Sequence, residues 1–351
     1  MTMKRLLLIL IATMALSCTR EYPEVIHIEG GKLHVQGIAL DQKANCMYCS
    51  FTSAFFKTDL QGNITGSVTG INGHLGAMVF DPEGRKVYAS LEIKDDEIGK
   101  GIARTLGAQA HSKEQSRFYV AEIDVDKIIG LEMPFDDVVR LHHIEEAGRD
   151  YLAQVEVDGK KLEHRYGCSG IDGVAIGPAF GSGSCKADHL YVAYGVYGDT
   201  TRVDNDHNII LCYNLKDMSK AVHKYFVHTG NTRYGVQNMA YDKLSRKLYL
   251  AVYKGSKSQY PNYGLFALDI DQKPYFAPLK DVPYQSEDAE QLEVCGGWHF
   301  KWGSTGLHSL GDGRWYISEN GKENGVQYCN ARMYRLSEDG DSPFVPYIPE
   351  K

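Results

Sequence analysis

His34-Val-Gln-Gly-Ile-Ala-Leu-Asp41 is a short segment whose pattern returns four more times along the 351-residue chain. Each further copy keeps a His or Gly start followed by a mostly apolar run. The copies are His74-Leu-Gly-Ala-Met-Val-Phe-Asp81, Gly170-Ile-Asp-Gly-Val-Ala-Ile-Gly177, Gly235-Val-Gln-Asn-Met-Ala-Tyr-Asp242 and, most weakly, Gly303-Ser-Thr-Gly-Leu-His-Ser-Leu310. Recurrence at intervals of tens of residues indicates a repeat protein in which each copy begins one structural unit.

Each copy is followed by a second short apolar run that contains Tyr, at residues 46–51, 86–91, 190–194, 248–253 and 315–318. Tight-turn residues such as Asp81-Pro-Glu-Gly84 separate the two runs, which is the pattern of a β-hairpin. A third strand-like segment follows in every unit, at residues 55–60, 118–124, 209–214, 265–269 and 331–336. These units predict four-stranded antiparallel blades repeated radially, which is an all-β propeller.

Direct counting gives five blades. Six or seven are also compatible with the length, because a blade needs roughly 40–50 residues and residues 127–168 and 270–302 could each contain a degenerate blade. Residues 25–28 could close the ring by pairing with the last blade. We expect one domain over residues 25–351, since no Pro/Ser-rich linker divides the chain. Helices are expected only near residues 98–110 and 144–152.

The first 17 residues have the composition of an export signal, with Lys4-Arg5 followed by an apolar stretch that is too short to span a bilayer. Ala15-Leu16-Ser17-Cys18 resembles the lipobox of bacterial lipoproteins, which implies lipidation of Cys18 and a linker over residues 18–24. The expected location is therefore the cell envelope, as an outer-membrane lipoprotein facing the periplasm or the surface. The alternative is ordinary cleavage and a secreted protein.

The partners that we expect are a small molecule or a glycan, with membrane contact through the lipid anchor alone and a monomeric state. Nucleic acid is excluded, because the net charge is −7 and no basic stripe with interleaved aromatics occurs.

Seven cysteines follow Cys18. Cys46 and Cys49 lie within a predicted strand and are expected to be buried apolar residues rather than zinc ligands, and Cys168 with Cys185 is the expected disulfide.

In a propeller, the start of each innermost strand and the end of the next strand open on the same face around the central axis. The first-strand starts are expected to place His34, Gln36, His74, Asp172, Gln237, Asn238 and Thr305 there. The second-strand ends are expected to add Thr52, Glu92, Tyr194, Tyr253, Glu319 and Asn320. Long insertions on the same side, at residues 92–117, 195–208, 254–264, 320–330, 132–167 and 272–302, predict a built pocket.

His34 and His74 are the leading candidates for a catalytic acid or base, because imidazole titrates near neutral pH and a carboxylate can orient it. The same ring of His, Asp, Glu and Asn side chains could instead hold a divalent cation, or it could be polar only because channel water must be satisfied. Gln36, Gln237, Thr305 and Asn320 are predicted to bind substrate. Trp298 and Trp302 could stack on sugar rings, although blade packing explains them equally well.

The GxSxG, P-loop, HExxH and dinucleotide-binding signatures are missing from the chain. Hydrolysis through a serine triad is therefore not indicated.

Residues 34–62 contain the patterns HxQGhxhD, hYhS and KTDhxG, where h is an apolar residue and x is any residue. These patterns resemble those of the NHL/gluconolactonase-like β-propellers and the propeller lipoproteins of Bacteroidetes. That resemblance implies a divalent cation such as Ca²⁺ on the axis, for which Asp172, Asn238 and Glu92 or Glu319 are the corresponding positions. Resemblance to propeller polysaccharide lyases and hydrolases implies instead catalytic roles for channel His and Tyr residues, here His34, His74, Tyr194 and Tyr253.

The function that we expect is an envelope-anchored hydrolase or lyase acting on a carbohydrate or a related polar small molecule. The alternatives are a non-catalytic surface module that binds a ligand or a protein, and a structural partner in an envelope complex.

Overall fold

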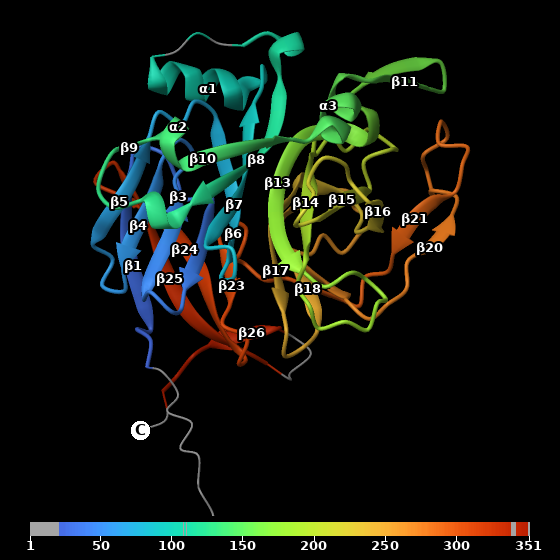
Figure 1. Ribbon diagram of the computed structural model, residues 1–351. Coiled ribbons are helices and arrows are strands. Elements are labelled where there is room, and N and C mark those ends of the chain that lie inside the picture. The colour runs from blue at the N-terminus through green and yellow to red at the C-terminus, as the bar shows by residue number, and fades with distance from the viewer. Residues whose placement is uncertain (1–20, 108, 110, 338–341, 350–351) are drawn as a thin grey trace, which may run out of the picture.

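The computed structural model describes residues 21–349 except 108, 110 and 338–341. Its strands form five antiparallel-dominated sheets arranged in a ring, which confirms a β-propeller and fixes the number of blades at five (Figure 1). The signal and lipidation predictions for residues 1–17 and Cys18 lie outside the described residues. None of the described helices is both long enough and apolar enough to cross a bilayer.

Blades 1 and 2 come from residues 37–143. Blade 1 consists of β2 (Gly37–Asp41), β3 (Cys46–Ser50), β4 (Phe55–Asp59) and β5 (Ile64–Thr69), with β9 (Met133–Pro134) added in parallel at its outer edge. Blade 2 consists of β6 (His74–Asp81), β7 (Lys86–Ile93), β8 (Arg117–Asp124) and β10 (Val139–His143).

Blades 3 and 4 follow. Blade 3 consists of β13 (Cys168–Gly177), β14 (His189–Val196), β15 (His207–Asn214) and β16 (His223–His228), extended by β21 (Ala289–Leu292) and β20 (Tyr275–Ala277). Blade 4 consists of β17 (Thr232–Asp242), β18 (Lys247–Lys254), β19 (Leu265–Asp269) and β22 (Gly296–Trp298). Residues 127–168 and 270–302 therefore hold no sixth blade; their strands extend existing sheets or form the separate hairpin of β11 (Gln154–Val157) and β12 (Lys160–Glu163).

Blade 5 closes the ring with strands from both ends of the chain. It contains β23 (Leu307–Ser309), β24 (Arg314–Glu323), β25 (Val326–Leu336) and β26 (Phe344–Pro346). β1 (Val25–Gly31) pairs antiparallel with β25, which confirms the predicted closure. The carbonyls of Pro23 and Glu24 also accept hydrogen bonds from this blade, so the last residues of the expected linker lie against it.

The helices are few and gather at one end of the ring, at the top of Figure 1. α1 (Glu97–Leu106) and α3 (Glu145–Leu152) match the two predicted helical regions, and α2 (Phe135–Val138) is a single turn. Asp96 caps α1 by accepting a hydrogen bond from the Gly99 N–H, and Gly107 ends the helix in the left-handed conformation. The predicted insertion at residues 320–330 is wrong, because β24 and β25 stay paired out to Glu323 and Val326.

The innermost strands approach one another closely at the fourth position of the repeated octapeptide. A Cβ on Gly37 would lie 2.9 Å from the backbone nitrogen of Met78 in blade 2, and a Cβ on Gly173 would lie 3.0 Å from the carbonyl oxygen of Val236 in blade 4. A Cβ on Gly306 would lie 2.8 Å from the Ile38 side chain. Gly37 and Gly173 therefore allow the backbones of neighbouring blades to meet, and Gly306 leaves room for the Ile38 side chain of the next blade.

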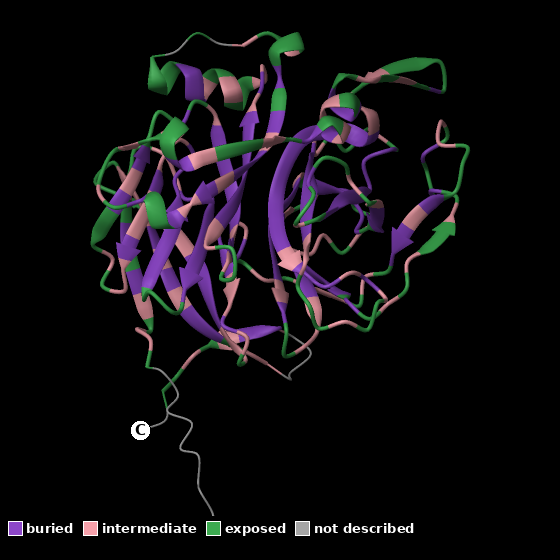
Figure 2. Ribbon diagram, viewed as in Figure 1, coloured by how far each residue is buried: buried purple, intermediate pink, exposed green. Residues whose placement is uncertain are grey.

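The core lies between the faces of adjacent blades, where the strands are buried along most of their length (Figure 2). Cys46 and Cys49 are both buried in β3, as the strand pattern predicts. The predicted disulfide between Cys168 and Cys185 is wrong, because both thiols are free. Cys168 begins β13 and is buried, whereas Cys185 is exposed beyond the far end of that ten-residue strand, which at about 3.3 Å per residue spans roughly 30 Å.

Gly37→Ala tests whether close backbone approach limits the ring. The added Cβ meets Met78 and Ala77 backbone atoms that cannot rotate away, so we expect the free energy of unfolding to fall by about 1–3 kcal/mol in urea denaturation. Gly148→Ala is the control, because nothing lies within 4 Å of its Cβ position and it sits within α3; it should gain about 0.5–1 kcal/mol. Equal stability of Gly37→Ala and the wild type would contradict the packing argument.

Candidate functional site

A cavity of about 880 Å³ opens on the axis of the ring. Four blades supply its walls, and no described residue of blade 5 lines it. The lining residues are His34, Gln36, His74, Glu92, Lys94, Ile98, Ser169, Asp172, Gly198, Asn231, Arg233, Tyr234, Gln237, Tyr253, Lys254, Gly255 and Ser256. The volume is within the usual range for small-molecule sites, about 300–1,000 Å³.

Bulges in three inner strands shape this cavity. The pairing register shifts between Leu75 and Met78 in β6, between Ile171 and Val174 in β13, and between Arg233 and Val236 in β17. A bulge inserts an unpaired residue and re-aims neighbouring side chains. Tyr234 lies in the third bulge with a φ of 64°, a strained conformation for a large side chain.

His74 and Glu92 form a fixed pair at the cavity. They are cross-strand partners in β6 and β7, and His74 Nδ1 lies 3.3 Å from Glu92 Oε2. Burial alone would raise the pKa of Glu92, but the charge of Lys94 and the hydrogen bond from His74 outweigh it, so this pKa is lowered. An ionised carboxylate only accepts hydrogen bonds, so Nδ1 of His74 carries a proton in this contact, and in the neutral ring the lone pair lies on Nε2.

Lys94 is a buried cation two residues beyond Glu92. Its Nζ lies 2.8 Å from Glu92 Oε2 and 3.5 Å from Asp96 Oδ2, and it donates to the Ser169 carbonyl at 2.9 Å. Burial alone would lower the pKa of Lys94, but the charges of Glu92, Asp96 and Asp172 outweigh burial and raise it. The ammonium group therefore stays charged and joins the strand end of blade 2 to blade 3.

Asp172 faces the same cluster from β13. Its Oδ2 accepts a hydrogen bond from Gln237 Nε2 at 3.0 Å, and the Gln237 amide also donates to the Tyr234 carbonyl. Burial, followed by the negative charge of Glu92, raises the pKa of Asp172 well above its ordinary value. Asp172 is thus a carboxylic acid that holds its proton where an exposed aspartate would have lost it.

His34 is held differently from His74. Its Nδ1 lies 2.9 Å from the Val35 carbonyl, which only accepts, so its Nε2 is the acceptor for the amide of Gln36 at 3.2 Å. Burial is the main cause that lowers the pKa of His34, and the charge of His74 acts in the same direction. His34 is therefore a neutral ring whose lone pair is already used.

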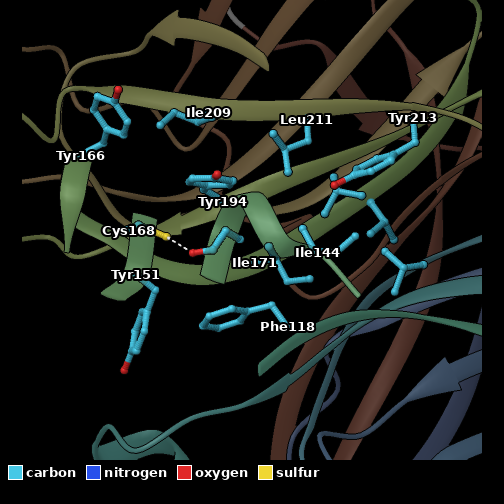
Figure 3. Close-up of a cluster of buried hydrophobic side chains, with 14 of the residues drawn as sticks. Phe118, Ile144, Tyr151, Tyr166, Cys168, Ile171, Tyr194, Ile209, Leu211 and Tyr213 are labelled. Atoms are coloured by element: carbon cyan, nitrogen blue, oxygen red, sulfur yellow. Dashed lines mark hydrogen bonds between the residues drawn. The ribbon is translucent and has the colours of Figure 1, made fainter. Parts of the chain in front are cut away.

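Seven of the residues expected at the centre line the cavity together, namely His34, Gln36, His74, Glu92, Asp172, Gln237 and Tyr253. Tyr194 does not. Its ring is fully buried in the core between blades beside Phe118 and Ile171 (Figure 3), and its hydroxyl donates to Asp150 at 2.9 Å. Strand side chains project from the two faces of a blade toward neighbouring blades, so nearness to a strand end does not by itself aim a side chain at the axis.

The remaining predicted residues lie outside the cavity lining. Asn238 donates to the carbonyls of Gln36 and Ser304 and thereby ties blade 4 to blades 1 and 5. Thr305 donates to Ser318 and Asn320 within blade 5.

Glu319 and the two tryptophans are also occupied elsewhere. Glu319 accepts from Tyr334 and Arg332 at the outer strands of blade 5. Trp298 and Trp302 pack against the cluster that contains Trp315.

Five further residues line the cavity that the sequence pattern did not predict, namely Lys94, Asn231, Arg233, Tyr234 and Lys254. Lys94 follows Glu92 by two residues, so strand alternation placed it on the same side. Arg233 and Tyr234 directly precede the fourth octapeptide, as part of the extended inner strand β17. The sequence feature that could have indicated Arg233 and Tyr234 is the longer run of strand residues before the fourth octapeptide.

Within the described residues, one group of side chains could hold a metal ion. His74, Glu92 and Asp172 each offer a ligand atom, and these atoms lie within 4.8 Å of one another. The axial set that the resemblance implies does not converge, because Asn238 and Glu319 are engaged elsewhere. Ca²⁺ takes six to eight oxygen ligands, and here the Lys94 ammonium already neutralises Glu92, so the residues present do not fit a calcium site of that kind.

Comparison with models of known protein families finds none that matches the chain, and comparison with curated proteins finds no match either.

Asp172→Asn should change the pH dependence of stability. Because the folded-state pKa of Asp172 is raised, the wild type loses stability as the pH rises above the ordinary pKa of aspartate toward this raised value. The variant avoids that loss, so its melting temperature relative to wild type should increase from pH 4 to pH 8.

Asp217→Asn is the control of opposite sign. The hydroxyl of Ser219 lowers the pKa of Asp217, so this variant should lose stability relative to wild type at neutral pH and regain parity as the pH falls. A pH-independent difference between Asp172→Asn and wild type would show that folding does not raise the pKa of Asp172.

Proposed function

We propose that the protein is an extracytoplasmic enzyme, a hydrolase or lyase, that acts on a carbohydrate or a related polar small molecule in the axial cavity by general acid–base catalysis. The observation that carries the proposal is the convergence of the His74–Glu92 pair and Asp172 at one cavity, with their ligand atoms within 4.8 Å. A residue in a cleft whose pKa is perturbed by burial and by a specific charged partner is a candidate functional residue.

His74 is the base in this proposal. Glu92 accepts from Nδ1 and so fixes the ring and its tautomer, which leaves Nε2 to take a proton. Glu92 is a positioning residue, because its Oε1 also accepts from the Ile171 N–H at 2.7 Å. His34 positions Gln36 instead of acting as the base, since its lone pair is engaged.

Asp172 is the acid. Burial and the negative charge of Glu92 raise its pKa well above the ordinary value, which favours the protonated form that a general acid requires. In hydrolysis, His74 would take the proton of a water that attacks the substrate, while Asp172 gives its proton to the leaving oxygen. In elimination, His74 would take a proton from carbon, a double bond would form, and Asp172 would again protonate the leaving oxygen.

The polar lining supports a hydroxyl-rich substrate. Gln36 and Gln237 present amides, Ser169 presents a hydroxyl, and Tyr234 and Tyr253 present rings that contact edge to face, 6.3 Å between centroids. Hydroxyl groups need donors and acceptors, and the apolar face of a sugar ring packs on aromatic rings. Tyr253 thus serves as a binding wall, which differs from the catalytic role expected from the sequence.

His74→Asn tests the proposal. Loss of a general base typically costs about 10²–10⁴-fold in rate, and we expect that loss in turnover of whichever member of a panel of 4-nitrophenyl glycosides, uronate oligosaccharides and sugar lactones the wild type converts. Asp172→Asn should lose activity by a similar factor. His142→Asn is the matched control, since His142 also contacts a glutamate, Glu122 at 2.7 Å, but lies on β10 outside the cavity.

Two other outcomes would replace the proposal. Binding of a panel member without turnover by the wild type would favour a ligand-binding module. Loss of activity on treatment with EDTA, restored by one divalent metal and accompanied by that metal in elemental analysis, would favour metal-dependent chemistry at His74, Glu92 and Asp172. Wild-type turnover in the His74→Asn variant would end the acid–base assignment.

A further inference from the structure

We propose that the ligand of the axial cavity is an anionic carbohydrate, a hydroxylated ring with one acid group, and that Arg233 and Lys254 bind the acid group. This inference rests on the proposed function in one respect, which is that the ligand is a carbohydrate. The new element is its charge and the side of the cavity that recognises it.

The charge of the cavity lining favours an anionic ligand. The chain has a net charge of −7, yet three cations, Lys94, Arg233 and Lys254, line the cavity against two carboxylates, Glu92 and Asp172. Lys94 is paired with Glu92 at 2.8 Å, and Asp172 shares its site with that ionised carboxylate. Arg233 and Lys254 are therefore left without a counter-charge inside an acidic protein, which favours an anion in the cavity.

Arg233 and Lys254 have no carboxylate partner among the residues that the structure describes. Other arginines behave differently: Arg202 binds Asp204 at 2.8 Å, and Arg246 binds Asp271 at 2.5 Å. Arg233 instead lies over the ring of Tyr234, with 5.4 Å from Cζ to the ring centroid. Packing against a ring restrains the guanidinium and leaves its N–H groups available for a bidentate anion.

A buried hydrogen-bond donor lies beside these cations. Asn231 is 2 % exposed and its Oδ1 accepts from the Ser256 N–H at 3.1 Å. Its Nδ2 has no hydrogen-bond partner within the described part of the chain. A buried amide without a partner is costly, and a ligand oxygen at the cavity wall would satisfy it.

The positions of these three residues give the recognition a direction. Asn231, Arg233 and Lys254 all belong to the blade 4 side of the cavity, at β17 and the end of β18, and the Tyr234–Tyr253 pair lies on the same blade. His74 and Glu92 lie on blade 2 and Asp172 on blade 3. The acid group would thus be bound by blade 4 while the reacting part of the ring faces blades 2 and 3.

Calorimetric titration of the full chain tests this inference. The probes are D-glucuronate, glucose 6-phosphate, glucose 6-sulfate and neutral D-glucose, so that the carboxylate, phosphate and sulfate sources of the anion are compared on one ring. We expect at least one anionic sugar to bind at least tenfold more tightly than glucose. Arg233→Gln and Lys254→Gln should each weaken that binding by about tenfold or more, as loss of a charge-assisted hydrogen bond does.

Controls separate site effects from net charge and from folding. Arg140→Gln and Lys216→Gln remove exposed cations away from the cavity and should leave the affinity unchanged. Circular dichroism should show wild-type melting for Arg233→Gln, because its side chain is exposed. Binding of the anionic sugar should also weaken as NaCl rises, since exposed charges are screened.

The outcomes distinguish the two proposals. Anionic sugars that bind no better than glucose, or no binding of any probe, would overturn the anion inference, and turnover of a neutral glycan that depends on His74 would then leave the proposed function standing. Conversely, anion binding that depends on Arg233 and Lys254, together with turnover unaffected by His74→Asn, would support the anion site and overturn the acid–base function.

Discussion

Close contact between the backbones of neighbouring inner strands is the constraint on which this structure depends. Five blades meet around a narrow axis, and the fourth position of the octapeptide is where one strand lies against the next. Gly37, Gly173 and Gly306 occupy it where no side chain can be accommodated, and Ala77 is tolerated in blade 2. At the same position in blade 4, Asn238 uses its amide to bridge the carbonyls of Gln36 and Ser304.

The hydrogen bond that joins blades 2 and 3 differs from the one that joins blades 1 and 2, and the site lies around it. Between blades 1 and 2, the Leu75 N–H donates to the carbonyl of Thr52 at the end of the preceding second strand. Between blades 2 and 3, the corresponding N–H of Ile171 donates to the Glu92 carboxylate instead. This joint therefore brings a charge into the ring, and Lys94, His74 and Asp172 are arranged around that charge.

Glu92 binds both the backbone of blade 3 and the charged side chains of the cavity. We therefore assign it a positioning role and not a catalytic one. Both of its oxygens are occupied, one by the backbone of blade 3 and one by Lys94 and His74. Breaking a buried ion pair by removing one partner typically costs about 3–5 kcal/mol, so loss of this carboxylate would destabilise the fold and would also release the imidazole of His74. Asp172 and the Nε2 of His74 are the groups left to face a ligand.

Much of the fold followed from the sequence because the repeat reports strand phase directly. The third strands, the closure by residues 25–28 and the two longer helices were predicted from pattern. The repeat gave a direct count of five blades, and the structure excluded the alternatives of six or seven. The extra strands β20 and β21 were not predicted, since they extend blade 3 without repeating the motif. The register of the octapeptide also predicted that His34, Gln36, His74, Asp172 and Gln237 would meet, and they line one cavity.

The sequence by itself determined the blades and the polar positions of their inner strands, because both depend on local alternation and on glycine. Tertiary structure alone decided which polar residues share a cavity. Tyr194 lies opposite Ile171 as Leu91 lies opposite Leu75, whereas the cavity residue Glu92 lies opposite His74. Tyr194 is therefore one residue short of the cavity position and binds Asp150, and Glu319 binds Arg332 outside the cavity. Side-chain direction at a strand end depends on bulges and on partners from distant segments, as for Arg233 and Tyr234 in β17, and short-range pattern does not encode those partners.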